Sequence, residues 1–298
     1  MRSDAAAVRK AAPPHGGGRS LREPDATPAR AAEEETGWSG ALLCLPLALT
    51  LALVVYWPLS HLFSTLFTRA GSEALWQVLS AGRYRTSLLN SLLLSVAAAA
   101  LSLLLSLIPA WVLARECFRG QGLLRGLISL PLTFSGVLVG FLAVVMLGRA
   151  GAVPSLLRFL TGREVLAGSA YTLGGLFTAY LYFEVPRAVM TLEPSFRRIP
   201  RELDAAARSL GAVPLSRLGR VFLPIAAPAL RATFALAFSA SLGSFGVALM
   251  LARRFTVAPL EVYTQLTGFS NDSVAGALCL VLAASSFLAD RLLSGGRA

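Results

Sequence analysis

Long apolar stretches constrain this chain more than any other feature. A helix that crosses a membrane needs about 20 mostly apolar residues. Six segments meet or approach that length: Ser39–Leu59, Leu88–Leu113, Gly126–Leu147, Gly168–Val185, Ala232–Ala252 and Asp272–Ala289. Only 14% of the residues are charged, whereas a soluble domain carries about 25%. The sequence therefore predicts an all-α membrane protein in which residues 38–298 form one domain of six transmembrane helices.

Residues 1–37 have a different character from the rest of the chain. They are rich in Ala, Pro, Gly and charged residues and show no apolar periodicity. Such a segment cannot bury enough apolar surface to offset the entropy of ordering, so it is predicted to be a disordered cytoplasmic tail. It is also unlike a signal peptide, because no small-residue cleavage pattern follows Leu59.

The basic residues predict the orientation of the helices. With the N-terminus inside, the tail, the first loop, the long loop at 187–231 and the C-terminus carry six, three, eight and two of the 27 Lys and Arg residues. Cytoplasmic loops of membrane proteins carry an excess of Lys and Arg. We therefore expect a multi-pass protein of the inner membrane with both termini cytoplasmic. The net charge of +11 follows from these loops and does not indicate binding to nucleic acid.

The long loop reads IPRELDAAARSLGAVPLSRLGRVFLPIAAP from Ile199 to Pro228. Pro200 can take the first position of a helix, where its missing N–H is no loss. Glu202 and Asp204 then lie in the first turn and Arg208 near the end, which suits the helix dipole. The alanines between them are the best helix formers. The pattern predicts a short, well-formed helix.

A turn and a second helix are expected to follow. Gly211 can adopt the left-handed conformation that ends a helix, and Pro214 can begin the next one, which runs towards Pro224. A helix of this kind with a small-residue face allows a partner surface to approach closely. An amphipathic helix lying on the membrane interface is the alternative interpretation.

The same loop resembles a motif of ABC importer permeases: Glu-Ala-Ala, three residues, Gly, nine residues, Ile, any residue, Leu-Pro. Alignment on the glycine gives these matching positions: Ala206, Ala207, Gly211, Val221, Leu223 and Pro224. Ala205 stands where the family has its glutamate, and Glu202 or Asp204 could replace that acid. The resemblance implies that this loop forms the coupling helix, which docks into a groove on the ATPase subunit.

Segments within the predicted spans are similar to the same family. SLGSFG at 241–246 resembles a Ser-Leu-Gly-Glu-Phe-Gly segment in the fifth span of sulfate, molybdate, iron and thiamine permeases, with Ser244 in place of the glutamate. The segments at 129–141 and 259–269 resemble the polyamine, iron, thiamine and phosphonate branch. Together these similarities cover about residues 40–290 and imply a MetI-like permease fold.

The sequence lacks the residues that ATP hydrolysis would need. A phosphate-binding P-loop ends in Gly-Lys-Ser/Thr, and the one lysine, Lys10, lies in VRKAA. ATP and Mg²⁺ are therefore expected on a separate ATPase subunit, with no cofactor, metal or catalytic residue in this chain. The resemblance further implies a second permease subunit, identical or homologous, and a periplasmic or lipid-anchored solute-binding protein.

Polar side chains inside the predicted spans are neutral. They could line a translocation path or hold helices together, and Ser135, Ser241 and Ser244 are the candidates for the path. Glu184 lies near the cytoplasmic end of the fourth predicted span, where a snorkelling or loop-anchoring role is expected. An ion-coupled secondary transporter usually carries acids or bases deep in its spans, so that alternative is disfavoured, as is a membrane scaffold without transport. The sequence favours the permease subunit of an ATP-driven importer.

Overall fold

The computed structural model describes residues 45–57, 60, 64, 67–163, 166–253 and 255–294. The chain divides into two units, Met1–Leu59 and Ser60–Ala298. The predicted tail at 1–37 lies outside the described residues and stays a prediction. In the first unit, the described residues 45–57 are helical, and Leu45–Val54 is an apolar helix shorter than a full span. The first predicted span, Ser39–Leu59, thus lies partly outside the described residues.

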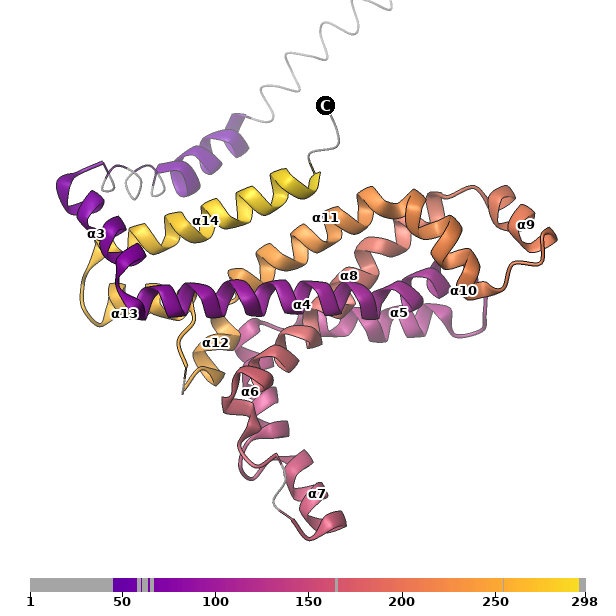
Figure 1. Ribbon diagram of the computed structural model, residues 1–298, viewed down its shortest axis with the longest axis horizontal. Helices are drawn as coiled ribbons and strands as arrows, with labels where there is room; N and C mark the ends of the chain where they lie inside the picture. The colour runs from indigo at the N-terminus through magenta and orange to yellow at the C-terminus, as the bar shows by residue number, and fades with distance from the viewer. Residues whose placement is uncertain are drawn as a thin grey trace, which may run out of the picture. The chain divides into compact units, whose positions relative to one another are not determined.

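The described part of the second unit consists of helices and turns, with no strand among its residues (Figure 1). The helices are α3 Arg69–Ser80, α4 Gly82–Arg115, α5 Gln121–Ser129, α6 Gly136–Leu147, α7 Ala152–Thr161, α8 Leu173–Arg198, α9 Arg201–Ser209, α10 Pro214–Arg217, α11 Leu223–Leu242, α12 Phe245–Leu251, α13 Ala258–Thr267 and α14 Asp272–Ser294. The predicted all-α class is confirmed.

Four segments of the described chain are long and apolar enough to cross a membrane. They are Gly82–Arg115, Gly136–Thr161, Pro214–Leu242 and Asp272–Leu293. These correspond to the second, third, fifth and sixth predicted spans. The fourth predicted span becomes α8, which continues 13 residues beyond Val185 to Arg198 and carries several charged residues. The structure therefore supports four of the six predicted spans, and the other two stay predictions.

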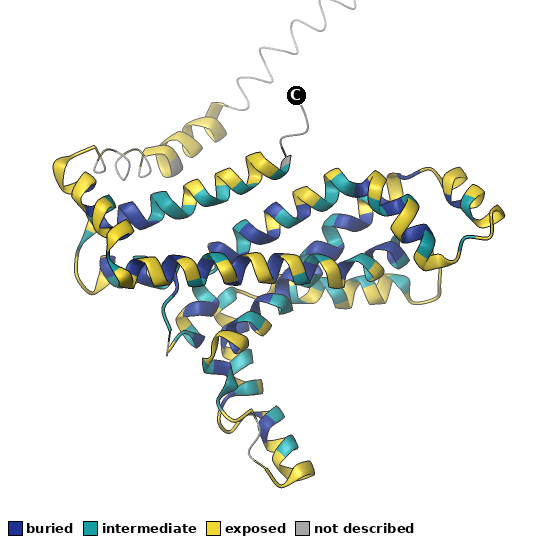
Figure 2. Cartoon of the chain, in the orientation of Figure 1, coloured by how far each residue is buried: buried dark blue, intermediate teal, exposed yellow. Residues whose placement is uncertain are grey.

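The longest helix, α4, packs through a stripe of small residues. Its buried positions include Ser87, Ser91, Ser95, Ala98, Ala99, Ser102 and Ser106, which recur every three or four residues and so share one face. This face meets α8 and α11 (Figure 1). The opposite face of α4 is exposed, as the alternating colours of Figure 2 show, and carries Leu89, Leu93 and Leu104. Small side chains let membrane helices approach closely, so these serines serve helix packing.

Two predicted spans are interrupted. The third predicted span, Gly126–Leu147, contains the end of α5, a 3₁₀ turn at Leu130–Thr133 and the start of α6 at Gly136. The fifth predicted span, Ala232–Ala252, ends as α11 at Leu242 and resumes as α12 at Phe245. The prediction of continuous helices was wrong in both places.

The restarted helices α6 and α12 pack against each other. A Cβ atom on Gly246 would lie 2.8 Å from the backbone nitrogen of Val137, and one on Gly140 would lie 2.8 Å from Cβ of Met250. Contacts this short leave no space for a side chain at either glycine. Gly246 thus allows the starts of α6 and α12 to touch, and Gly140 makes room for Met250 near the end of α12.

Candidate functional site

The segment at 199–228 forms the helix, turn and helix that the sequence predicts. Glu202 and Asp204 lie in the first turn of α9, and Arg208 lies in its last turn. Pro200, however, caps the helix and does not form its first residue, because its ψ of 138° is extended. Gly211 has φ +78°, so the predicted left-handed turn is confirmed. Pro214 begins α10, as predicted.

Beyond α10 the chain stays helical through the predicted end at Pro224. A π-helical turn at Leu218–Phe222 connects α10 to α11, and Pro224 lies in the first turn of α11. Val221 and Leu223 are half-buried against a core that includes Phe222. These two motif residues therefore anchor the base of the segment, whereas Pro224 is exposed.

An ion pair fixes α9 relative to α10. Asp204 is buried and accepts hydrogen bonds from Nη1 of Arg217 at 2.6 Å and from Nη2 of Arg208 at 3.0 Å. Burial alone would raise the pKa of Asp204, but the hydrogen bonds and positive charges of Arg217 and Arg208 outweigh burial and lower this pKa below its usual value. The carboxylate is thus ionised at physiological pH and holds the two helices together.

Two arginines at this site also contact aromatic rings. The guanidinium of Arg217 lies 5.6 Å from the ring centre of Trp111, and that of Arg115 lies 4.7 Å from the ring centre of Phe222. Arg115 also donates a hydrogen bond to the carbonyl of Ile199. The end of α4 therefore contacts the start of the 199–228 segment at Ile199 and its second half at Arg217 and Phe222.

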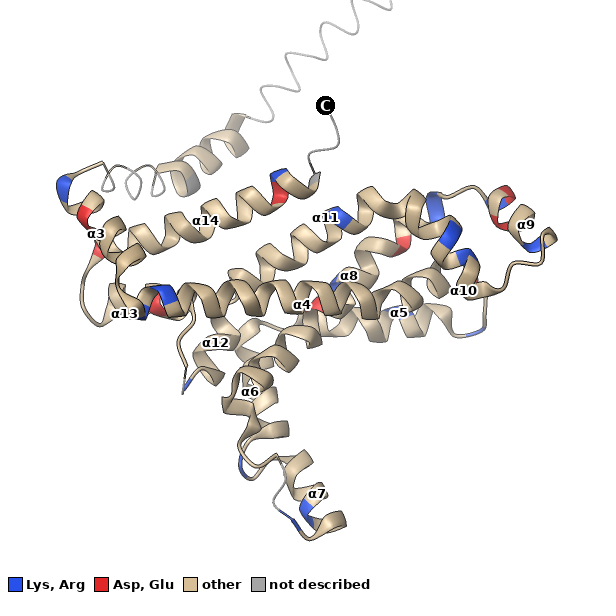
Figure 3. Ribbon diagram, in the orientation of Figure 1, with Lys and Arg blue, Asp and Glu red and all other residues tan. Residues whose placement is uncertain are grey.

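The outer face of this segment is open. Glu202, Ala205 and Ala206 are exposed on α9, and Ala207 is half-buried. Leu210 is 88% exposed directly before the Gly211 turn. Figure 3 shows that charged residues are frequent along α9 and α10. Small and apolar groups exposed on a rigidly held turn suit a protein partner. The structure thus separates the two candidate acids, with Asp204 facing inward and Glu202 outward.

A second cluster lies where α8 passes the break between α11 and α12. Glu184 is completely buried, and its Oε1 accepts hydrogen bonds from Ser241 Oγ at 3.2 Å and from Arg187 Nη1 at 3.1 Å. Tyr180, one turn earlier, donates a hydrogen bond to the carbonyl of Ser244 at 3.2 Å. The expected snorkelling or loop-anchoring role of Glu184 was wrong, because α8 continues well past it and the side chain is buried in the helix bundle, bonded to Ser241 of α11.

The three serines predicted for the path have different positions. Ser244 lines a cavity of about 170 Å³ together with Arg187 and residues from both helix breaks. Ser135 caps α6 at its own break by accepting a hydrogen bond from the backbone N–H of Leu138. Ser241 is buried and binds Glu184. The structure therefore brings all three to the two helix breaks, but only Ser244 lines this cavity.

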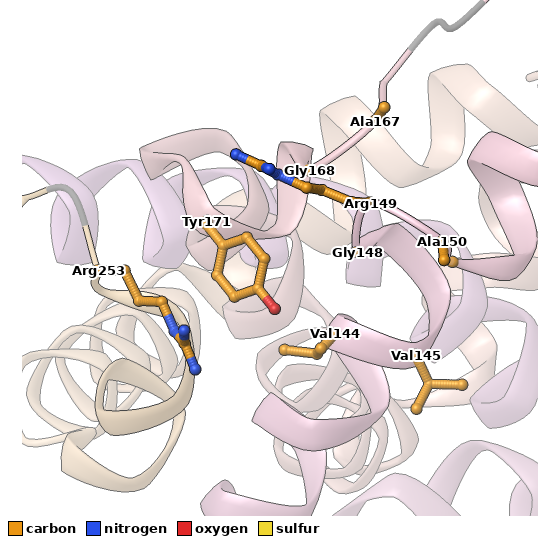
Figure 4. A pocket seen from close by; sticks show the side chains of 10 residues that line it. Val144, Val145, Gly148, Arg149, Ala150, Ala167, Gly168, Tyr171 and Arg253 are labelled. Carbon is orange, nitrogen blue, oxygen red and sulfur yellow. The ribbon is translucent and has the colours of Figure 1, made fainter.

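A larger cavity of about 720 Å³ lies at the other end of α6. Arg149, Tyr171 and Arg253 line it, together with apolar residues of α6. Figure 4 shows the ring of Tyr171 with Arg149 on one side and Arg253 on the other. The guanidinium of Arg253 lies 5.2 Å from the centre of this ring, a distance typical of a cation–π contact.

Apolar helices that are interrupted beside polar cavities are typical of membrane transport proteins. The model of the family "Binding-protein-dependent transport system inner membrane component" matches residues 103–294, so the chain belongs to this family. It is the permease subunit of an ABC importer. This is a family of transport permeases and not of enzymes.

Similar proteins agree with this assignment. The chain is 28% identical over 244 residues to the sulfate transport system permease protein CysT of Salmonella typhimurium, covering 80% of this chain and 86% of that protein. It is 32% identical over 213 residues to the molybdenum transport system permease protein ModB of Haemophilus influenzae, covering 68% and 91%. These relatives do not single out the polyamine, iron, thiamine and phosphonate branch.

A solved structure shares the fold. A chain of a bacterial ABC transporter that imports the acidic polysaccharide alginate superposes with a TM-score of 0.75 at 16% identity, covering 91% of this chain and 100% of that chain. A second structure of the bacterial alginate ABC transporter, in complex with an alginate pentasaccharide-bound periplasmic protein, gives a TM-score of 0.74 at 16% identity, with 88% and 94% covered. The expected MetI-like permease fold is confirmed.

Proposed function

We propose that the 199–228 segment couples this permease to a separate ATPase subunit, with α9 and the Gly211 turn as the docking element. The observation that carries the proposal is the open surface of Ala205, Ala206 and Leu210 on a helix that the Asp204–Arg217 pair holds in place. A partner groove could approach the backbone of α9 closely at the two alanines and enclose the side chain of Leu210.

ATP and Mg²⁺ would bind to that partner, because the lone Lys10 has no P-loop sequence around it. A second permease subunit, identical or homologous, would complete the path, and a periplasmic or lipid-anchored binding protein would deliver the solute. The related alginate transporter, which was solved with its periplasmic protein, supports this last partner. Ser135, Ser241 and Ser244 would lie along or beside the path.

The basic loops support an inner-membrane orientation with both termini and the 199–228 segment in the cytoplasm. On this topology the cavity of Arg149 and Arg253 lies on the periplasmic side. ATP-driven closure of the ATPase subunits would move α9 and switch the path between its inward- and outward-facing forms.

The docking proposal is tested with two matched pairs of variants. Gly211→Val places a β-branched residue in a left-handed turn, at a cost of about 1 kcal/mol or more. Gly162→Val is its control, because Gly162 also has positive φ and open space around its Cβ position but lies on the loop after α7. Ala206→Arg adds bulk to the docking face, and Ala70→Arg adds the same bulk to an exposed position of α3, outside the four apolar segments.

We expect Gly211→Val and Ala206→Arg to insert in the membrane normally, yet to lose the ATPase subunit during purification and to lose solute uptake. Both control variants should keep the ATPase subunit. Full retention of the ATPase and of uptake in Gly211→Val and Ala206→Arg would show that this segment is not the docking element.

A further inference from the structure

The cavity between the helix breaks has one charged group in its lining. Its residues are Pro131, Leu132, Phe134, Gly136, Val139, Phe183, Arg187, Ala240 and Ser244. All but Arg187 are neutral, so the charged group that a solute would meet in this lining is a guanidinium. Charges inside a membrane domain are costly and are found mostly where they serve a solute or ion.

Neighbouring groups hold this guanidinium at the cavity. Glu184, which is fully buried behind it, accepts a hydrogen bond from Nη1 at 3.1 Å, and the ring of Phe183 lies 5.4 Å from the guanidinium carbon. The side chain of Arg187 is still 33% exposed. Its remaining N–H groups make no side-chain hydrogen bond to the described residues. A carboxylate thus fixes one edge of the guanidinium and leaves the other available.

The larger cavity, at the other end of α6, is also lined by positively charged side chains. Arg149 and Arg253 line it, and no carboxylate is among its lining residues or in an ion pair with either arginine in the described part of the chain. Both cavities adjoin α6, one at Gly136 and Val139 and the other at Val144 and Gly148. Twelve residues of helix separate Gly136 from Gly148, which corresponds to about 18 Å.

We propose that this permease carries a small oxyanion, with Arg187 as the residue that selects it inside the helix bundle. A planar guanidinium binds tetrahedral or carboxylate oxygens through paired N–H groups, which gives selectivity as well as attraction. A cationic solute such as a polyamine or thiamine would meet like charge in both cavities. The volume of about 170 Å³ suits a small ion. This inference rests on the proposed transport function and narrows its solute.

The test uses the complete importer, with its ATPase and binding protein, in proteoliposomes, and measures ATP-driven uptake of radiolabelled sulfate, molybdate and putrescine. Removing Arg187 alone would leave Glu184 buried without a counter-ion, so the informative variant is Glu184→Gln/Arg187→Gln. Glu184→Gln alone keeps the cation in the cavity. The control is Arg83→Gln/Glu261→Gln, because Glu261 is also buried and paired with an arginine at 3.0 Å, but neither residue lines either cavity.

We expect the wild type and Glu184→Gln to take up an oxyanion. The Glu184→Gln/Arg187→Gln variant should lose that uptake by about ten-fold or more, the effect of a lost charge-assisted hydrogen bond. The control should stay close to wild type. Absence of oxyanion uptake by the wild type would overturn the proposal, whether or not putrescine is taken up. Unchanged oxyanion uptake in the variant that lacks Arg187, or an equal loss in the control, would also overturn it. Co-purification of the ATPase subunit measures docking independently of uptake. A failure of the coupling proposal can therefore be distinguished from a failure of the oxyanion proposal.

Discussion

Replacing Asp204 by Asn should loosen the 199–228 segment without unfolding the helix bundle. Asn keeps the size of the side chain but removes the charge that faces Arg217, whose side chain is only 6% exposed. The pair with Arg208 counts for little, because that side chain is 53% exposed and solvent screens it. The main effect is therefore a buried cation without a counter-ion.

The size of this effect follows from the surroundings of Arg217. Breaking a buried pair by removing one partner costs about 3–5 kcal/mol. Arg217 keeps its contact with the ring of Trp111 and gains an amide oxygen as acceptor, so we expect a smaller cost of about 2–4 kcal/mol. At about 1.4 kcal/mol per factor of ten, local opening becomes roughly 30- to 700-fold more frequent.

Hydrogen exchange of the purified importer measures this opening. Amides of α9 and α10 should lose protection in Asp204→Asn, while amides of the buried face of α4 should not change. Glu202→Gln is the control, because it removes a negative charge from the same turn at an exposed position. Equal protection in Asp204→Asn and Glu202→Gln would refute the view that the Asp204–Arg217 pair fixes α9 to α10.

Three further predictions follow from the same geometry. If Glu202 replaces the glutamate that the family motif has at position 205, Glu202→Ala should weaken retention of the ATPase. Adding Ala205→Glu to that variant should then restore retention, and a failure to restore it would contradict the replacement. Gly246→Ala should lower the melting temperature of the detergent-purified protein more than Gly140→Ala, because the atom nearest its new methyl group is a backbone nitrogen, whereas the nearest atoms to one on Gly140 belong to the side chain of Met250. Loss of the ATPase on acidification should begin only when the pH falls below the ordinary aspartate pKa of 3.8, since the lowered pKa of Asp204 keeps the stabilising carboxylate ionised above it; release of the ATPase between pH 8 and 6 would contradict this.

The turn at Gly211 was predictable because its causes are local. A left-handed glycine, a proline at the start of a helix and acids in a first turn depend on a few adjacent residues, and all three are present. The sequence did not predict which of Glu202 and Asp204 points inward. That depends on the packing of α10 against α9, which brings Arg217 to Asp204 across 13 residues of chain.

The interrupted spans could not be located from apolar composition. Both sides of the break are rich in apolar residues, FALAFSASL before Gly243 and FGVALML after Ser244, so composition does not indicate where the helix ends. The available signal was the spacing of glycines, with Gly136 and Gly140 on α6 and Gly246 on α12. Even this spacing indicates a close contact only once the partner helix is known.

The three predicted spans that differ most from the structure are the third, the fourth and the fifth, and their helices α6, α8 and α12 contact one another. This coincidence has a physical reason. Irregular backbone inside a membrane is tolerated only where other protein groups or a cavity satisfy its N–H and C=O groups, so a break in one helix requires a second element beside it. The hydroxyl group of Tyr180 on α8 meets this need by donating to the carbonyl of Ser244 at the break. The serines of α4, by contrast, lie on a continuous helix and pack against neighbours. The translocation path is therefore expected at the breaks, where Arg187 and Ser244 share a cavity, and not along the polar stripe of α4.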